Sequence, residues 1–364
     1  MSGFRAVVGL VAALTGLVAG RAFAVNIETV PVGNPGNAAD MRYNLDQRPE
    51  GFGRVDYTYN IGKYEVTAGQ YTEFLNAVAK TDTYGLYNPF MDYDAYPSSL
   101  GCNIKRSGTP GSYNYSVAPD WANRPVNWVS WGDAARFANW LHNGQPTGAQ
   151  DLSTTEDGAY YLNGVTGDQA LVTVARKPGW KWATPTEDEW YKAAYHMNDG
   201  VTGNYWNYPT GSDSVPGNTL GNPADPGNNA TYRDQENGYT IESPYWRTEV
   251  GDHENSGSPY GTFDQGGNVQ EWNEAVLHNM YRGIRGGSFS LFSDWLPASR
   301  RYNGFPPGEF YSIGFRVCEV PEPASLAILA LGGTGLLLGR RAPGRQPSAR
   351  QSPHGRLDPV VPGT

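Results

Sequence analysis

Apolar residues recur at helical spacing in three short stretches of the chain, each preceded by a sequence that can cap a helix. The apolar stretches are residues 71–78, 134–141 and 190–194, and the capping sequences are TAGQ at 67–70, SWGD at 130–133 and TEDE at 186–189. Asn or Gly lies near the expected end of each helix, at residues 76–80, 142–144 and 198–200. We therefore predict three short amphipathic helices.

The remaining apolar runs are short and bounded by Gly, Asn, Pro or Ser, which is typical of short strands joined by long turns. These runs are residues 55–61, 181–183, 282–289 and 313–318. There is no tandem repeat and no β-α-β alternation. The pattern predicts a single irregular, loop-rich α+β domain. Its largest loop region, residues 210–261, is rich in Gly, Asn and Asp, and a bound ion could offset the entropy of closing it.

The N-terminal segment has the pattern of a secretory signal peptide. Arg5 is followed by an apolar run from 6 to 19 and by Ala-Phe-Ala at 22–24. We interpret residues 1–24 as a cleaved signal peptide, with a buried N-terminal helix as the alternative. The mature chain would begin near Val25, and residues 25–49 would lead into the main domain.

The C-terminal segment combines Val-Pro-Glu-Pro at 320–323, sixteen uncharged residues at 324–339 and two arginines at 340–341. This order resembles the PEP-CTERM sorting signal of Gram-negative bacteria, which an exosortase recognises. The resemblance implies export across the inner membrane, to the periplasm, cell surface or extracellular matrix, with segment 320–341 in the membrane before processing. An ordinary C-terminal membrane anchor is the alternative. Residues 342–364 form a polar tail, which we expect to be disordered.

Composition and charge narrow the protein class. Aromatic residues make up 13% of the 364 residues and charged residues only 17%, with 46 Gly and 27 Pro. These values argue against a coiled coil and against a wholly disordered chain. Residues 25–320 contain 20 Lys and Arg against 34 Asp and Glu. A surface this acidic repels phosphate backbones, so we expect no nucleic-acid partner.

The chain has only two cysteines, Cys102 and Cys318, and its 5 histidines are scattered. Structural zinc is therefore not expected, because no Cys/His cluster is present. In an oxidising compartment the two cysteines could form one disulfide. Two buried free thiols are the alternative, and the sequence does not decide between them.

A segment rich in glycine, residues 260–272, places Asp264 and Glu271 seven residues apart. Glycines allow the backbone to turn its carbonyls inward, and carboxylates with carbonyls are the ligands that calcium takes up. A plain turn explains the same residues equally well.

Six motifs follow one another along the chain: KYEVT at 63–67, PVNWVSWGDA at 125–134, ATPTEDEW at 183–190, GNVQEW at 267–272, RGGSF at 285–289 and GFRV at 314–317. In these motifs and their order, the chain resembles the sulfatase-modifying-factor family, the formylglycine-generating-enzyme-like domains, over residues 50–318. We assign the domain to residues 50–319. The resemblance implies a single compact α+β unit related to C-type-lectin-like folds.

The resemblance also implies structural calcium. Motif matching assigns one site to Asp264, the carbonyls of Gly267 and Val269, and Glu271. A second, looser match falls on Asn229, the carbonyls of Ala230 and Tyr239, and Asn237.

The catalytic motif of the family is altered. Its oxidases carry two cysteines, after the RGGSF motif, that bind copper(I) and the substrate thiol; here these positions are Leu291 and Leu296. Leucine cannot ligate copper, so copper and formylglycine generation are not expected. The groove of the family would be bordered by Arg285, Ser288, the two leucines, Arg300 and Arg301.

Two functions remain open. The first is an exported binding or structural module with extracellular polysaccharide or a surface protein as its partner. The second is an enzyme, either formylglycine-generating or of another oxidation, that uses an unrecognised site.

Overall fold

The computed structural model describes residues 24–43, 48–94, 100–221 and 226–320. The predicted signal peptide, apart from Ala24, and the sorting segment beyond Val320 lie outside the described residues. None of the described helices combines the length and the hydrophobicity needed to span a bilayer.

The three predicted helices are confirmed: α1 (Ala68–Val78), α3 (Trp131–His142) and α5 (Glu187–Tyr195). A reciprocal capping box starts each one, at Thr67, Ser130 and Thr186. The first backbone N–H groups of each helix therefore find side-chain acceptors, which fixes where the helix begins. The shorter helical elements are α2 (Pro119–Ala122), α4 (Asp168–Thr173), η2 (Pro89–Met91) and η3 (Ser293–Trp295).

Two four-stranded sheets form the framework. The first has the order β1-β2-β12-β5, with β1 (Thr29–Val32), β2 (Tyr59–Gly62), β12 (Cys318–Glu319) and β5 (Trp182–Ala183), and its neighbours are antiparallel. The segment 25–49, which we had separated as a lead-in, thus supplies β1. Its Thr29 lies opposite Gly62.

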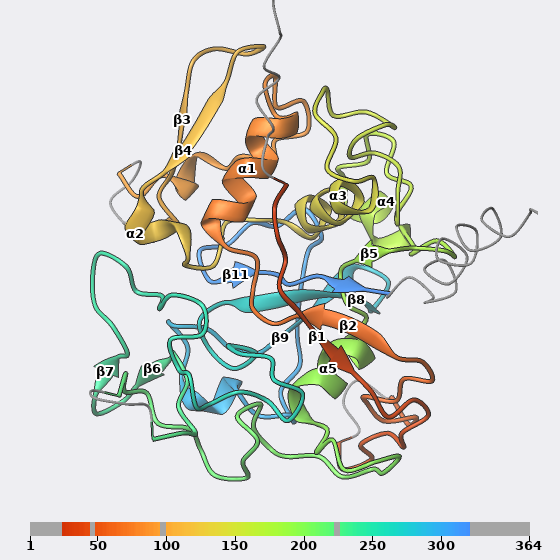
Figure 1. Ribbon diagram of the computed structural model, residues 1–364, viewed down its shortest axis with the longest axis vertical. Coiled ribbons are helices and arrows are strands. Elements are labelled where there is room, and N and C mark those ends of the chain that lie inside the picture. Colours follow the sequence, from red (N-terminus) through yellow and green to blue (C-terminus); the bar gives the residue numbers. More distant parts are fainter. Residues whose placement is uncertain (1–23, 44–47, 95–99, 222–225, 321–364) are drawn as a thin grey trace, which may run out of the picture. The chain divides into compact units, whose positions relative to one another are not determined.

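The second sheet has the order β10-β9-β8-β11, with β10 (Tyr302–Gly304), β9 (Tyr281–Arg285), β8 (Gln270–Leu277) and β11 (Ile313–Gly314). Strand β11 is parallel to β8, with Ile313 opposite Gln270. The β8–β9 pairing shifts register between Trp272 and Val276, where the chain bulges. Figure 1 shows β8 crossing the domain between α3 and α5, and both helices contact it.

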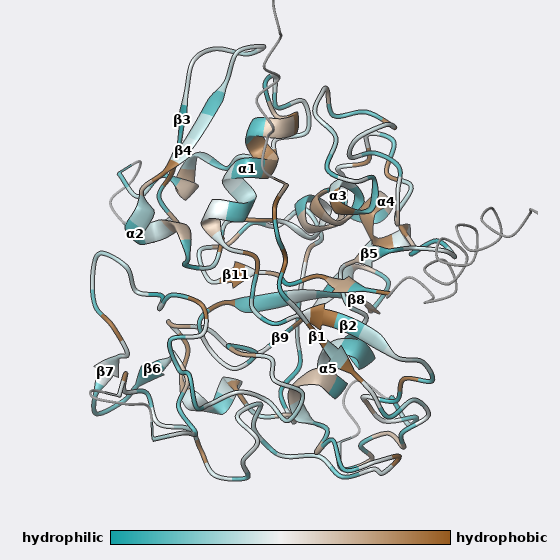
Figure 2. Ribbon diagram, viewed as in Figure 1, coloured by the Kyte–Doolittle hydropathy of each residue, from teal (hydrophilic) through white to brown (hydrophobic). Residues whose placement is uncertain are grey.

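Two small hairpins complete the framework, β3 (Ile104–Ser107) with β4 (Asn114–Val117) and β6 (Arg233–Asp234) with β7 (Gly238–Tyr239). Figure 2 shows that hydrophobic residues lie along parts of α1, α3 and β2, whereas the β3–β4 hairpin is mostly hydrophilic.

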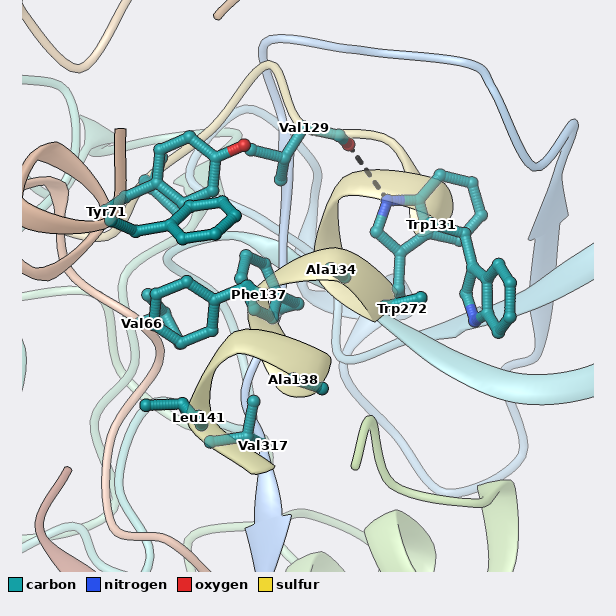
Figure 3. Close-up of a cluster of buried hydrophobic side chains, with 14 of the residues drawn as sticks. Val66, Tyr71, Val129, Trp131, Ala134, Phe137, Ala138, Leu141, Trp272 and Val317 are labelled. Atoms are coloured by element: carbon teal, nitrogen blue, oxygen red, sulfur yellow. Dashed lines mark hydrogen bonds between the residues drawn. The ribbon is translucent and has the colours of Figure 1, made fainter. Parts of the chain in front are cut away.

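Aromatic rings fill the core, as the composition suggests. Phe137 of α3 packs edge-on against Phe74 and Phe315, with ring centroids 5.3 and 5.4 Å apart. Trp272 of β8 is fully buried, and its indole N–H donates to the Val129 carbonyl over 3.0 Å. Figure 3 shows Phe137 and Ala134 of α3 between Tyr71 of α1 and Trp272 of β8. Buried rings of this size dominate core energetics, and the indole also satisfies its polar group.

Candidate functional site

A pocket of about 510 Å³ opens beside the second sheet, and we call it the groove pocket. Its lining residues are Gln270, Tyr281, Ile284, Leu291, Trp295, Tyr302, Asn303, Gly304, Phe305, Phe310, Tyr311, Ser312 and Ile313. Strands β8, β9, β10 and β11 thus contribute to its lining, together with the segments 291–295 and 305–312. A volume of this size is within the range of small-ligand sites.

The side chain of Gln270 is the most deeply buried polar group of the groove pocket. Only 4% of Gln270 is exposed. Its backbone N–H donates to the Ser312 carbonyl over 2.8 Å, and its pairing with Ile313 holds the residue at the start of β8. Among the described residues, its side-chain amide has no hydrogen-bond partner. Because neither amide atom of Gln270 is among the buried side-chain atoms that lack a partner, the amide is accessible from the pocket and available to a ligand.

Aromatic side chains line the same pocket as this amide. Trp295, which ends η3, packs edge-on against Tyr302 of β10, with ring centroids 5.5 Å apart, and Tyr281 of β9 lies 4.8 Å from Phe305. Several of the rings are open to solvent: Tyr302 is 45%, Phe305 44% and Phe310 46% exposed. Large exposed rings gathered around one cavity are typical of a binding site rather than of a closed core.

The segment 305–311, which carries the lining residues Phe305, Phe310 and Tyr311, is anchored to the start of α3. The Trp131 N–H donates to the Pro306 carbonyl over 2.9 Å, and the Trp128 N–H donates to the Phe310 carbonyl over 3.1 Å. Glu309, between these anchors, is hydrogen-bonded to Asp133 and accepts a hydrogen bond from Asn88. Burial, followed by the negative charge of Asp133, raises the pKa of Glu309 to about 9. The two carboxyl groups therefore share a proton at neutral pH.

Replacement of Glu309 by glutamine should stabilise the protein at alkaline pH. A carboxyl whose pKa is raised by folding contributes its stability below the unfolded pKa and loses it as the pH rises through the folded pKa of about 9. Glutamine keeps a donor toward Asp133 and does not titrate. We expect the variant to be roughly 1–3 kcal/mol more stable than the wild type at pH 9 and similar to it at pH 4, measured by urea unfolding. If the variant and the wild type differ in stability by the same amount at pH 9 and at pH 4, Glu309 and Asp133 do not share a proton.

The predicted groove residues do not all reach the pocket. Leu291 lines it, whereas Leu296 is fully buried in a cluster with Ala230 and Tyr232. Ser288 is also fully buried, and its hydroxyl lies 3.2 Å from that of Ser290. The two positions that we matched to the family's cysteines therefore face different surroundings, one the pocket and the other the core.

The predicted groove arginines have ion-pair partners. Arg285 and Arg301 each donate through Nε to Glu187 Oε1 over 2.8 Å, and both are largely buried. Arg300 lies at the surface and pairs with Asp294 over 2.7 Å. Burial alone would raise the pKa of Glu187, but Arg285 and Arg301 outweigh it and lower that pKa. Arg285 and Arg301 therefore hold β9 and the end of segment 296–301 against α5.

In the predicted first calcium site, both carboxylates already accept hydrogen bonds from other groups of the protein. Both carboxylate oxygens of Glu271 bind Arg316, over 2.6 and 2.7 Å, and Oε2 also accepts the Trp190 indole N–H. Asp264 is half-buried and adopts a left-handed backbone conformation with φ +59°, and its Oδ2 accepts the Gly251 N–H over 2.7 Å. Glycine is required at 267, where φ is +92° and a Cβ would collide with the Thr231 carbonyl.

Sequence reasoning missed a third carboxylate beside these two, and its side chain is buried. Glu65, from the KYEVT motif, accepts the Val269 N–H over 3.2 Å and the Asn268 side-chain N–H over 3.1 Å. Burial, Asp264 and Glu271 raise the pKa of Glu65 well above its usual range. Burial also raises the pKa of Asp264 to about 7. This region therefore has more negative than positive charge when its carboxyl groups ionise.

The second calcium assignment combines a buried residue with an exposed one. Asn229 is 5% exposed, and its N–H donates to Ser256 Oγ over 2.9 Å. Asn237 lies exposed in the turn of the β6–β7 hairpin, and its N–H donates to Asp234. The Ala230 carbonyl accepts a long hydrogen bond from Thr240, and Tyr239 pairs with Arg233 in the hairpin. Within the described residues, no group of three or more His, Cys, Asp or Glu side chains is arranged to hold a metal.

The disulfide alternative is not realised, because Cys102 and Cys318 are both free, buried thiols. Cys318 lies on β12 in the first sheet, where its thiol contacts the Ala183 carbonyl and Glu189. Burial raises the pKa of both thiols, for Cys318 well above its usual range. Neither cysteine lines the groove pocket.

Three solved structures that align with this chain were compared with it. The solved structure titled "Crystal Structure of CarF" aligns with a TM-score of 0.50 and 19% identity, covering 82% of this chain and 99% of CarF. Treponema denticola variable protein 1 aligns with a TM-score of 0.48, 18% identity and coverage of 82% and 97%. PvdO from Pseudomonas aeruginosa aligns with a TM-score of 0.42, 18% identity and coverage of 81% and 92%.

At 19% identity, the alignment with CarF supports a similar fold and does not bear on function. A search of curated proteins found no match. The model of the sulfatase-modifying factor enzyme 1-like domain, however, matches residues 26–320, which include β1 and every other described strand. The chain therefore belongs to the family of sulfatase-modifying factor enzyme 1-like domains.

Proposed function

We propose that this protein is an exported, non-catalytic binding module that holds its ligand in the groove pocket. One observation carries the proposal: Leu291, at the position we matched to a copper-binding cysteine, lines a pocket of neutral and aromatic residues. Copper(I) is selected by soft sulfur ligands, which a leucine does not provide. The rings and the buried amide of Gln270 instead offer contacts to a ligand that is bound without chemical change.

The two cysteines of the chain support the same proposal. A thiolate is the form that binds metal or attacks another sulfur, and burial of Cys102 and Cys318 favours the neutral thiol of each. Cys318 is at the first sheet and Cys102 precedes β3, so neither is among the residues that line the groove pocket.

Export is the second part of the proposal. It depends on the signal-peptide pattern of residues 1–24 and on the PEP-CTERM-like segment 320–341. We propose that an exosortase-type enzyme sorts the chain and that the domain acts at the surface or in the extracellular matrix of a Gram-negative bacterium.

We also propose that calcium stabilises the fold near Asp264. The carboxylate of Asp264 and the carbonyls of Gly267 and Val269 would hold it. The side-chain oxygen of Asn268, which is buried without a partner, fits such a site as a further oxygen donor. Glu271 does not fit while Arg316 occupies both of its oxygens. A divalent cation would balance the excess negative charge of the carboxylates of Glu65, Asp264 and Glu271.

Chelation of calcium should lower the melting temperature of the wild type. An ion that binds only the native state adds about 2.7 kcal/mol when it is present at a hundred times its Kd. The effect should be larger at pH 8 than at pH 5, because the raised pKa of Asp264, about 7, leaves its carboxyl protonated at pH 5. Asp264→Ala should abolish the response, whereas Asp252→Ala, which changes an exposed carboxylate nearby in the sequence, should retain it. If the chelator leaves the melting temperature of the wild type unchanged, the calcium proposal is refuted.

The copper part of the proposal is tested by titration of the purified protein with copper(I) against a chromophoric competitor. We expect no stoichiometric uptake in the wild type and none in a Cys102→Ala or Cys318→Ala variant. Uptake of one copper per chain that either substitution abolishes would favour an oxidase with an unrecognised site.

A further inference from the structure

We propose that the groove pocket binds an uncharged pyranose unit of a polysaccharide, with Gln270 as its polar anchor. The inference rests on the proposed binding function and specifies the chemical class of the ligand. Three features of the pocket carry it: the charge of its lining, the unpaired amide at Gln270 and the arrangement of its rings.

The charge of the lining selects an uncharged ligand. None of the described residues that line the pocket is Asp, Glu, Lys, Arg or His. The nearby arginines do not change this, since Arg285 and Arg301 are paired with Glu187 and Arg300 with Asp294. A uronic acid, a phosphate or an amine would lose its hydration in the pocket without gaining an opposite charge. A neutral ligand avoids this cost.

The amide of Gln270 selects a ligand with hydroxyl groups. The amide offers both an acceptor oxygen and two donor hydrogens, and each hydroxyl of a sugar can donate and accept. The residue is 4% exposed, so a ligand in the pocket would cover what remains accessible. A purely apolar group, such as a leucine or phenylalanine side chain of a peptide, would cover this amide and leave it unpaired, at a cost of about 1–3 kcal/mol.

The rings select a ligand with a flat apolar face. Trp295 and Tyr302 lie edge to face at 5.5 Å, and Tyr281 and Phe305 are tilted at 4.8 Å. The C–H face of a pyranose ring is apolar, while its edge carries hydroxyls, so one sugar unit can contact the rings and Gln270 together. The exposed rings of Phe305 and Phe310 extend the apolar surface beyond the cavity, which suits a chain of sugars rather than a single free sugar.

The test is a titration of the purified domain with neutral oligosaccharides, namely gluco-, galacto- and manno-oligosaccharides of both anomeric series, followed by saturation-transfer NMR and calorimetry. Oligogalacturonate and a neutral, leucine- and phenylalanine-rich peptide serve as competing ligand classes. We expect binding by at least one neutral series, with magnetisation transferred to ring C–H protons. Neither competing class should bind in the pocket.

Two variants connect binding to the pocket. Gln270→Leu should weaken the binding about 5- to 100-fold, because it removes the polar anchor but keeps the volume. Tyr302→Ala should also weaken it, whereas Tyr161→Ala, at an exposed tyrosine outside the pocket, should not. The melting temperature of each variant shows whether it is folded. If Gln270→Leu does not fold, the binding measured with Tyr302→Ala decides whether the glycan binds in the groove pocket.

The possible failures are distinguishable. Binding of the peptide instead of any glycan, with loss in Tyr302→Ala, would overturn the inference and leave the binding module intact. Binding of a neutral glycan that neither pocket variant weakens, or no binding by any of the three neutral series, would also overturn the inference. Copper-dependent oxidation of a peptide thiol would overturn the proposed function itself.

Discussion

Replacement of Glu187 by alanine is expected to lower the free energy of unfolding by about 3–5 kcal/mol, because it leaves buried cations without their partner. Glu187 is 3% exposed at the start of α5 and binds Arg285 and Arg301, each through Nε over 2.8 Å. The side chain of Arg285 is 0% exposed and cannot turn to solvent without disturbing β9. Denaturant unfolding at pH 7 measures the change.

A matched control for this prediction is Glu50→Ala. Glu50 also pairs with an arginine, Arg48, over 3.1 Å, but its side chain is 65% exposed. Its loss should change stability by less than about 1 kcal/mol. The pKa of Glu187 is lowered in the folded protein, so its contribution is present at neutral pH and is lost as the pH falls below about 4.5. If Glu187→Ala lowers the free energy of unfolding by less than about 1 kcal/mol, Arg285 and Arg301 find other partners in the variant.

The second large effect is expected for Glu271→Gln, which should also cost about 3–5 kcal/mol. The charge of Arg316 is then unpaired at a site where both side chains are 0% exposed. The loss should occur with and without chelator, because Glu271 acts through Arg316 rather than through calcium. Glu28→Gln, at the exposed pair with Lys63, provides the control and should change stability by less than about 1 kcal/mol.

A double variant separates the unpaired charge from other effects of the substitution. Glu271→Gln with Arg316→Met removes both charges and keeps similar volumes, so it should recover a large part of the lost stability. Thermal and denaturant unfolding of the four proteins forms a double-mutant cycle. If Glu271→Gln is destabilised only when calcium is present, Glu271 is a calcium ligand and the structural role assigned to it is wrong.

The elements that sequence predicted best are those that local interactions determine. The capping boxes at Thr67, Ser130 and Thr186 each join residues three apart, and all three are present in the structure. The third helix ends at Tyr195, a few residues before the predicted 198–200, because His196 is already in an extended conformation.

Strand β8 was less visible in the sequence. Its first residues belong to the GNVQEW motif, which we interpreted through its carboxylate and glycines as an ion-binding turn. The strand exists because it pairs with β9 on one side and β11 on the other. These partners lie farther along the chain, so local spacing does not reveal them.

The candidate site was predicted only in part, for the same reason. Leu291 does line the pocket, but Arg285 and Arg301 meet Glu187 across 98 and 114 residues of sequence. Gln270 was missed because its burial depends on β11.

The central claim, that this domain binds a ligand without oxidising a thiol, is tested most directly with a Cys-x-Pro-x-Arg peptide. The purified protein is incubated with the peptide, copper, oxygen and a thiol reductant, and the product is examined by mass spectrometry and hydrazide labelling. The account predicts unchanged cysteine peptide and no labelled aldehyde. Formylglycine that accumulates with protein concentration would contradict it.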